Sequence, residues 1–201
     1  MAKRNPVETG GQEKNKLVDE SSIHAISLII GAWKRQFTDE QNKVIIAEAL
    51  NYYTYREGLT IVGYLITNRR ICLVLETDKG DMENMLVMLY EGLKRAVQQY
   101  HDRLRNLGLT TYDNKQQEEK NELFTDMFIQ RPLVNDYLIR LITGRHVDLP
   151  YYNPHLARLK DRLHNYNFCS AIDYSGARGP VIVKLLDSDA DSNGGPEELN
   201  S

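Results

Sequence analysis

The alternation of apolar and polar positions divides the middle of the chain into strands and helices. A short Ile-rich run at residues 23–30 predicts a first strand, and two β-rich runs at 60–66 and 70–76 flank a turn, which indicates a hairpin. Apolar stripes at helical spacing predict a helix from Thr38 to residue 57 and a longer one from Asp81 to Leu107. Thr38 and Gln41 have the spacing of a capping box at the start of the first helix.

The second half of the chain has shorter patterns of the same kinds. Helical periodicity predicts helices at about 117–130, 133–143 and 154–165, and strand-like runs follow at 168–174 and 181–186 around a Gly-containing turn. Because the central strands form a hairpin, this order favours an α+β fold with an antiparallel sheet. We expect the strands at 23–30, 60–66 and 70–76 to be adjacent, with both long helices packed on one face of the sheet.

The composition of the two ends of the chain differs from that of the middle. Residues 1–21 and 187–201 are polar without apolar periodicity, so both are expected to be disordered tails around one domain at 22–186. The whole chain has 201 residues, 41% hydrophobic and 26% charged, which excludes wholesale disorder, a collagen-like repeat and a coiled-coil rod. Its formal net charge is −3, but the acidic segment 187–201 leaves the middle at about +2. A polyanionic partner is therefore permitted and not required.

Several function classes are excluded by missing patterns. No apolar run is long enough to span a membrane, and the polar first residues predict no secretory signal. Two cysteines, Cys72 and Cys169, predict buried reduced thiols in a cytoplasmic protein. The histidines have no metalloprotease spacing, and the chain contains no phosphate loop, Rossmann fingerprint or nucleophile elbow.

Basic residues gather at three places, which are the candidate DNA-binding positions. They are Lys34 and Arg35 beside Trp33, Arg69 and Arg70 at the hairpin, and Lys94 and Arg95 on the long helix. Trp33 is itself a candidate, expected to stack on an unpaired base. Cations interleaved with aromatic rings are typical of nucleic-acid surfaces, where they contact phosphates and stack on bases. Acidic residues lie among them, so ordinary solvated charge is the alternative interpretation.

The order of these features resembles a known family. A strand ending in Trp-Lys-Arg-Gln-Phe at 33–37 is followed by a helix, by the run Gly-Leu-Thr-Ile-Val-Gly-Tyr-Leu-Ile-Thr-Asn-Arg-Arg-Ile-Cys-Leu-Val-Leu at 58–75, and by a long helix. That long helix runs into Ala-Val-Gln-Gln-Tyr at 96–100. This resembles the bacterial single-tyrosine transposases of the His-hydrophobic-His type, the insertion-sequence-200-like family and its relatives associated with repetitive extragenic palindromes. The resemblance covers about residues 23–100. It implies a ferredoxin-like sheet, with residues 110–186 as a C-terminal helical and hairpin extension of a transposase-like domain.

The chain departs from the family at the residues that carry the chemistry. Aligning Tyr64 with the motif tyrosine puts Arg70 and Cys72 where the two metal-binding histidines belong. Arginine cannot ligate a metal, and a lone thiol is a poor ligand for the Mg²⁺ or Mn²⁺ that the family uses. A loose alignment puts Phe128 at the family's tyrosine nucleophile, and Tyr137 on the next predicted helix is a possible substitute.

Three hypotheses follow from the resemblance. In the first, the chain is a transposase relative that has lost the metal site. It binds single-stranded or hairpin DNA without cleaving it, and Arg70 contacts a phosphate. In the second, it is an active transposase with a relocated site. In the third, it is a protein-interaction or scaffold protein that has kept the fold and no longer binds nucleic acid. Members of the family commonly form dimers, so the resemblance also implies a homodimer for this chain.

Overall fold

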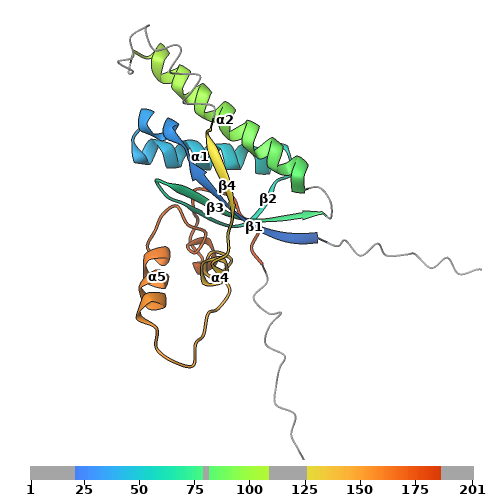
Figure 1. The fold of residues 1–201 in the computed structure, drawn as a ribbon, viewed down its shortest axis with the longest axis vertical. Helices are drawn as coiled ribbons and strands as arrows, with labels where there is room; N and C mark the ends of the chain where they lie inside the picture. Colours follow the sequence, from blue (N-terminus) through green and yellow to red (C-terminus); the bar gives the residue numbers. More distant parts are fainter. Residues whose placement is uncertain (1–20, 79–81, 109–125, 187–201) are drawn as a thin grey trace, which may run out of the picture.

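The structure, a computed structural model, describes residues 21–78, 82–108 and 126–186 (Figure 1). The first six main elements are β1 (Ser21–Ile30), α1 (Asp39–Arg56), β2 (Thr60–Ile66), β3 (Arg70–Asp78), α2 (Met82–Asn106) and β4 (Phe128–Pro132). The strands form one antiparallel sheet in the order β2-β3-β1-β4. This βαββαβ order is the ferredoxin-like arrangement, so the predicted α+β class is confirmed.

Some predicted features fall outside the described residues. The proposed tails at 1–20 and 187–201, the helix start at Asp81 and the segment 117–125 are among them. Ser21, which was assigned to the first tail, instead begins β1, where it pairs with Asp78.

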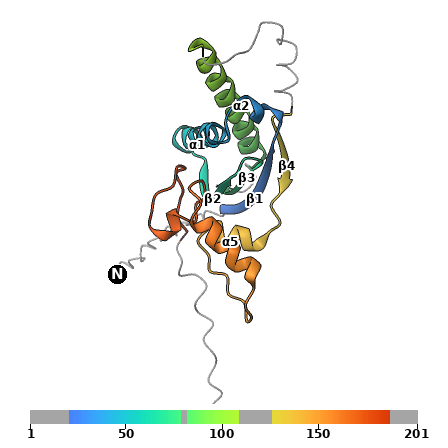
Figure 2. The ribbon, with the colours of Figure 1, turned by 90° about the vertical axis from the view of Figure 1, so that its left-hand side faces the viewer.

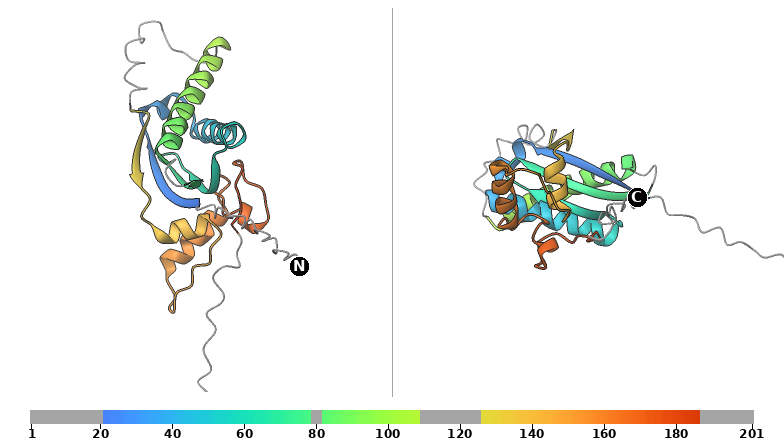
Figure 3. Two further views of the ribbon diagram at one scale, coloured as in Figure 1. Left: turned by 90° about the vertical axis from the view of Figure 1, so that its right-hand side faces the viewer. Right: turned by 90° about the horizontal axis from the view of Figure 1, so that it is seen from below.

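Both long helices pack on one face of the sheet, as predicted. Ile26 and Leu28 of β1 and Leu73 and Leu75 of β3 lie in the same buried cluster as the apolar residues of α1 and α2. Figures 2 and 3 show α1 and α2 together on that side. Since alternate residues of a strand point to opposite faces, the pattern at 71, 73 and 75 already indicated this face.

The start of α1 follows its capping box. The hydroxyl of Thr38 accepts a hydrogen bond from the Gln41 N–H at 3.2 Å, and the Thr38 N–H donates to the Gln41 side chain at 2.9 Å. These reciprocal bonds satisfy backbone donors that the helix itself leaves free. Neither α1, α2 nor any other described helix has both the length and the apolar character that crossing a membrane requires.

The opposite face of the sheet is covered in part by the C-terminal half of the chain. Two helices, α4 (Asp136–Ile142) and α5 (Pro154–His164), share a second buried cluster with Cys72 and Val74 of β3. Gly63 of β2 permits this contact, because a Cβ there would lie 2.7 Å from the Ile142 carbonyl oxygen. In Figures 2 and 3, α4 and α5 lie near one end of the sheet.

The helix predicted at 117–130 is wrong over its last residues, which form β4. This strand pairs with β1, for example Ile129 with Ile29 and Arg131 with Ser27. Its two faces, Phe128 with Gln130 and Ile129 with Arg131, show no hydrophobic alternation. Pairing with a strand about 100 residues earlier therefore decides its conformation, and local periodicity does not.

The predicted C-terminal hairpin is also wrong. Residues 168–174 make a single bridge between Cys169 and Leu65 and then turn into the short 3₁₀ helix η3 (Asp173–Ser175), and 181–186 is not a strand. Instead of pairing with each other, these two runs lie along the outer edge of β2. The side chain of Asn51 holds the second run, with its amide bonded to the Pro180 carbonyl at 2.8 Å and its oxygen to the Ile182 N–H at 2.7 Å.

The backbone groups on the outer edge of β2 are satisfied by this C-terminal segment. The Ile66 N–H donates to the Phe168 carbonyl at 2.9 Å, and the Lys184 N–H donates to the Ile61 carbonyl at 2.8 Å. The Tyr64 N–H donates to the Ser170 hydroxyl at 2.8 Å, while the Ser170 N–H donates back to the Tyr64 carbonyl at 3.0 Å. The edge strand is thereby closed without a fifth strand.

We predict that Ser170→Ala destabilises the fold by about 1–3 kcal/mol, because Ser170 is fully buried and its loss leaves the Tyr64 N–H without an acceptor. Urea denaturation of the variant and the wild type measures this. The exposed hydroxyl of Ser175 provides the control, and Ser175→Ala should cost clearly less. Equal unfolding midpoints for Ser170→Ala and the wild type would show that this edge contact does not stabilise the fold.

Candidate nucleic-acid interface

Four of the candidate basic residues lie at the same end of the sheet. Arg69 and Arg70 form the end of the β2–β3 turn, and the Arg69 carbonyl accepts the N–H of Ile30 at 2.9 Å. The 3₁₀ helix η1 (Ala32–Gln36), which carries Lys34 and Arg35, follows directly after β1. The turn and η1 therefore meet at the last residue of β1.

Trp33 lies in the core and not on this surface, which corrects the expectation that it stacks on a base. Its side chain is 0% exposed, and its indole N–H donates to the Met127 carbonyl at 2.9 Å. Its ring lies edge to face against Phe37 and Phe128, with centroids 6.2 and 5.6 Å away. Because both its ring and its N–H are used inside the protein, Trp33 anchors η1 and leaves its cationic neighbours at the surface.

The sheet places a further arginine, Arg131 of β4, on the same face as Arg70. Ile29 pairs with Arg70 on one side and with Ile129 on the other, and in the next row Ser27 lies between Cys72 and Arg131. Directly paired residues share a face, so the two arginines flank a strip of Ile29 and Ile129 on the side away from α1 and α2. Figure 3 shows no described helix over these parts of β1 and β4.

We call this surface the basic corner and define it as Lys34, Arg35, Arg69, Arg70 and Arg131. Except for half-buried Lys34, these side chains are exposed, and none of the five forms an ion pair with another described residue. The Lys34 ammonium group makes a long contact of 3.5 Å with the Ile30 carbonyl. Arg131 was missed by sequence reasoning, which left it between two predicted helices, although its place before Pro132 favours an extended conformation.

Lys94 and Arg95 lie elsewhere. Both belong to α2, which packs on the Leu73 face of the sheet, whereas Arg70 shares the face of Cys72. Arg95 lines a groove between α1 and α2 together with Glu48 and Arg103. The structure does not bring this pair together with the basic corner.

Arg70 and Cys72, which share one face of β3, have opposite environments. Arg70 is exposed at the start of β3, whereas Cys72 is 1% exposed beneath the C-terminal half of the chain. Burial raises the pKa of the Cys72 thiol, and the nearby Arg70 charge only partly offsets this. Among the described residues, no group of three or more His, Cys, Asp or Glu side chains is placed to hold a metal ion.

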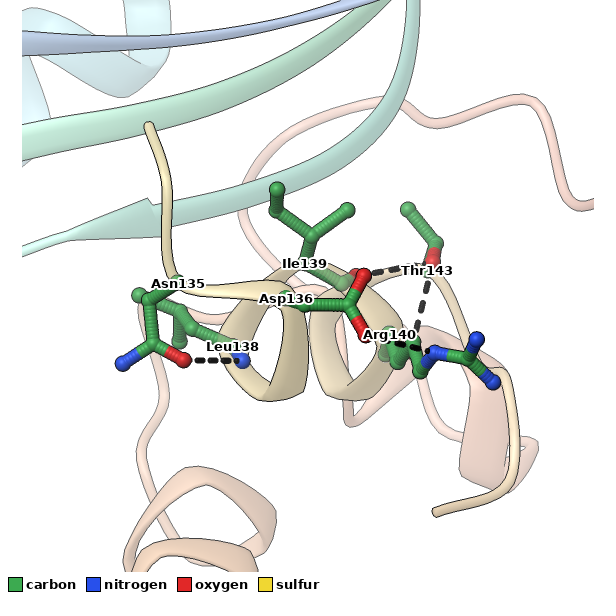
Figure 4. A network of polar contacts seen from close by, with 6 residues as sticks. All are labelled: Asn135, Asp136, Leu138, Ile139, Arg140 and Thr143. Atoms are coloured by element: carbon green, nitrogen blue, oxygen red, sulfur yellow. Dashed lines mark hydrogen bonds and ion pairs between the residues drawn. The ribbon is translucent and has the colours of Figure 1, made fainter. Parts of the chain in front are cut away.

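Tyr137, the candidate nucleophile, projects from the helix that covers Cys72. The helix α4 begins after Asn135, whose side-chain oxygen accepts the Leu138 N–H at 3.0 Å, and it carries an Arg140–Asp136 ion pair at 2.9 Å (Figure 4). Tyr137 is 41% exposed and makes no hydrogen bond with another described side chain.

Comparisons with known proteins give one match. No protein-family model and no curated protein matches the chain. Among solved structures, a crystal structure of a candidate transposase from Deinococcus radiodurans R1 is similar to it, with 11% identity, 79% of this chain and 97% of that chain covered, and a TM-score of 0.39. The assignment of function therefore rests on the residues of the chain itself.

We predict that both thiols are unreactive in the folded protein. Burial raises the pKa of Cys169 to about 11 and also raises that of Cys72, so little reactive thiolate is present at pH 8. Alkylation with iodoacetamide, followed by mass spectrometry, should be at least about 100-fold slower than in the guanidinium-unfolded chain. Rapid labelling of Cys72 in the native protein would mean that α4 opens readily and that this position is accessible.

Proposed function

We propose that this chain binds single-stranded or hairpin DNA at the basic corner and does not cleave it. The observation that carries the proposal is a group of five cations, gathered at one end of an antiparallel sheet, that have no ion-pair partner among the described residues. The resemblance to single-tyrosine transposases suggested the same end of the sheet from the order of elements.

The arrangement suits a flexible phosphate backbone. Arg70 and Arg131 are separated by two strand spacings across the sheet and by two residues along it, about 12 Å in all. Each guanidinium can form a fork of hydrogen bonds to phosphate oxygens. Between them, Ile29 and the 46% exposed Ile129 offer an apolar surface for the face of an unpaired base. Arg69, Lys34 and Arg35 continue the positive surface around the end of β1.

The absence of cleavage follows from the residues at the family's metal positions. Arg70 is permanently charged and repels a divalent cation, and the Cys72 thiol is buried in an apolar cluster. In our proposal, the Arg70 guanidinium neutralises the phosphate charge that the metal ion neutralises in the family.

A second candidate function is protein interaction without nucleic acid. It is favoured by the burial of Cys72, because the position that corresponds to the family's reaction centre is partly a packed core. The near-neutral charge of the whole chain, −3, agrees with it.

Binding across a salt series tests the first proposal. We expect wild-type affinity for single-stranded or hairpin DNA to fall steeply with salt, and Arg70→Gln or Arg131→Gln to weaken binding and lower the salt slope of log K by about one unit each. Arg158→Gln, at an exposed position of α5, is the matched control and should change neither quantity. Melting temperatures should stay nearly unchanged, since the substituted side chains are exposed.

Two results would contradict DNA binding at the basic corner. One is a wild-type protein without affinity for DNA even at low salt, which favours the interaction function. The other is binding that Arg158→Gln weakens as much as Arg70→Gln does, since the DNA would then follow net charge and not this surface.

The second test concerns cleavage. Incubation with hairpin DNA and Mg²⁺ or Mn²⁺ should give no shortened strand and no covalent protein–DNA adduct on a denaturing gel. An adduct that disappears in Tyr137→Phe would show that the active-transposase hypothesis is correct.

A further inference from the structure

A cavity of about 430 Å³ lies at the opposite end of the sheet from the basic corner. It opens between the end of α1, the start of β2, the end of β3 and the side of α2. Its inner wall is apolar, with Leu59, Met85 and Leu89 at most 8% exposed and Met88 at the rim. Cavities of this size commonly hold small organic molecules.

Its polar groups are mainly acidic. Glu57, Glu76 and Asp78 line the opening, and Glu76 is paired with Lys184 at 2.7 Å. Glu57 and Asp78 form no ion pair with another described residue. Glu57 also caps the C-terminus of α1, the end at which the helix dipole favours a positive charge. The opening therefore suits a cation.

Thr77 supplies an independent sign of a missing partner. It is 7% exposed, lines the cavity, and its hydroxyl has no hydrogen-bond partner in the part of the chain that the structure describes. Thr77 follows Leu73 and Leu75 at every second position of β3, so it shares their face and its side chain points toward the α1–α2 layer that contains the cavity. A buried hydroxyl without a partner is costly, and a polar ligand group beside it would remove that cost.

We propose that this cavity binds a small organic cation that joins one ammonium group to an apolar body. The ammonium group donates hydrogen bonds to the carboxylates of Glu57 and Asp78 and to the Thr77 hydroxyl oxygen. The apolar body lies against Leu89 and the two methionines, whose flexible thioethers adapt to alkyl groups and make favourable contacts with rings.

Calorimetric titration with three matched probes tests the site in the full-length chain. At pH 7, 2-phenylethylamine is protonated and should bind saturably with one molecule per chain. Uncharged 2-phenylethanol should bind at least about tenfold more weakly, and 3-phenylpropionate should not bind, because the carboxylates repel it. Equal affinity for the amine and the alcohol, or no saturable binding of the amine at millimolar concentration, would overturn the proposal.

Substitutions locate the binding. The double variant Glu57→Gln, Asp78→Asn should weaken binding of the amine at least about tenfold, and the nearly isosteric Thr77→Val should weaken it severalfold. Glu48→Gln removes a carboxylate of α1 outside the cavity and should leave the affinity unchanged. Binding that is insensitive to the double variant, or equally sensitive to Glu48→Gln, would place the amine elsewhere and overturn the proposal.

Discussion

The outer edge of β2 is the place on which the rest of the structure depends. A sheet edge presents unpaired N–H and C=O groups that attract other strands unless something covers them. Here the cover is a segment without regular strands, in which Ser170 both donates to and accepts from the backbone of Tyr64, 106 residues earlier in the chain. The hydroxyls of Tyr166 and Tyr174 add bonds to the carbonyls of Ile66 and Val62 at 3.0 and 2.7 Å. At the other edge, β4 is short and ends in a proline, which limits further pairing.

This cover determines which part of the sheet face remains available. The segment that reaches the β2 edge also positions α4, whose carbonyl at Ile142 contacts Gly63 so closely that only glycine fits there. As a result, the Cys72 side chain is buried, whereas Arg70, two residues earlier on the same strand face, is exposed at the surface. Two positions on the same strand face are thus divided between core and surface.

The parts that could be predicted from the sequence are those decided by neighbouring residues. The reciprocal hydrogen bonds of Thr38 and Gln41 and the apolar alternation along β3 each involve residues only a few positions apart in the sequence. Patterns of this kind predicted the first three strands and both long helices. The errors share a different cause. Trp33 was interpreted from its cationic neighbours, but its indole bonds to Met127, 94 residues away, and so it is buried. The strand β4, which carries Arg131, likewise depends on a distant partner, β1. The predicted C-terminal hairpin is wrong because these residues bond to β2 through side-chain hydroxyls and single backbone hydrogen bonds instead of forming a strand ladder with each other.

The distance in sequence between β2 and its cover has a consequence for how the chain folds. During synthesis β1, β2 and β3 leave the ribosome and can pair long before residues 166–184 are made. Through that interval the hairpin has an open edge and one bare face, and contacts of such long separation form slowly. The nascent chain therefore passes through a stage in which another nascent copy can occupy the place meant for its own C-terminal segment, and exchange of that segment between two chains is the misassembly to which this topology is most exposed.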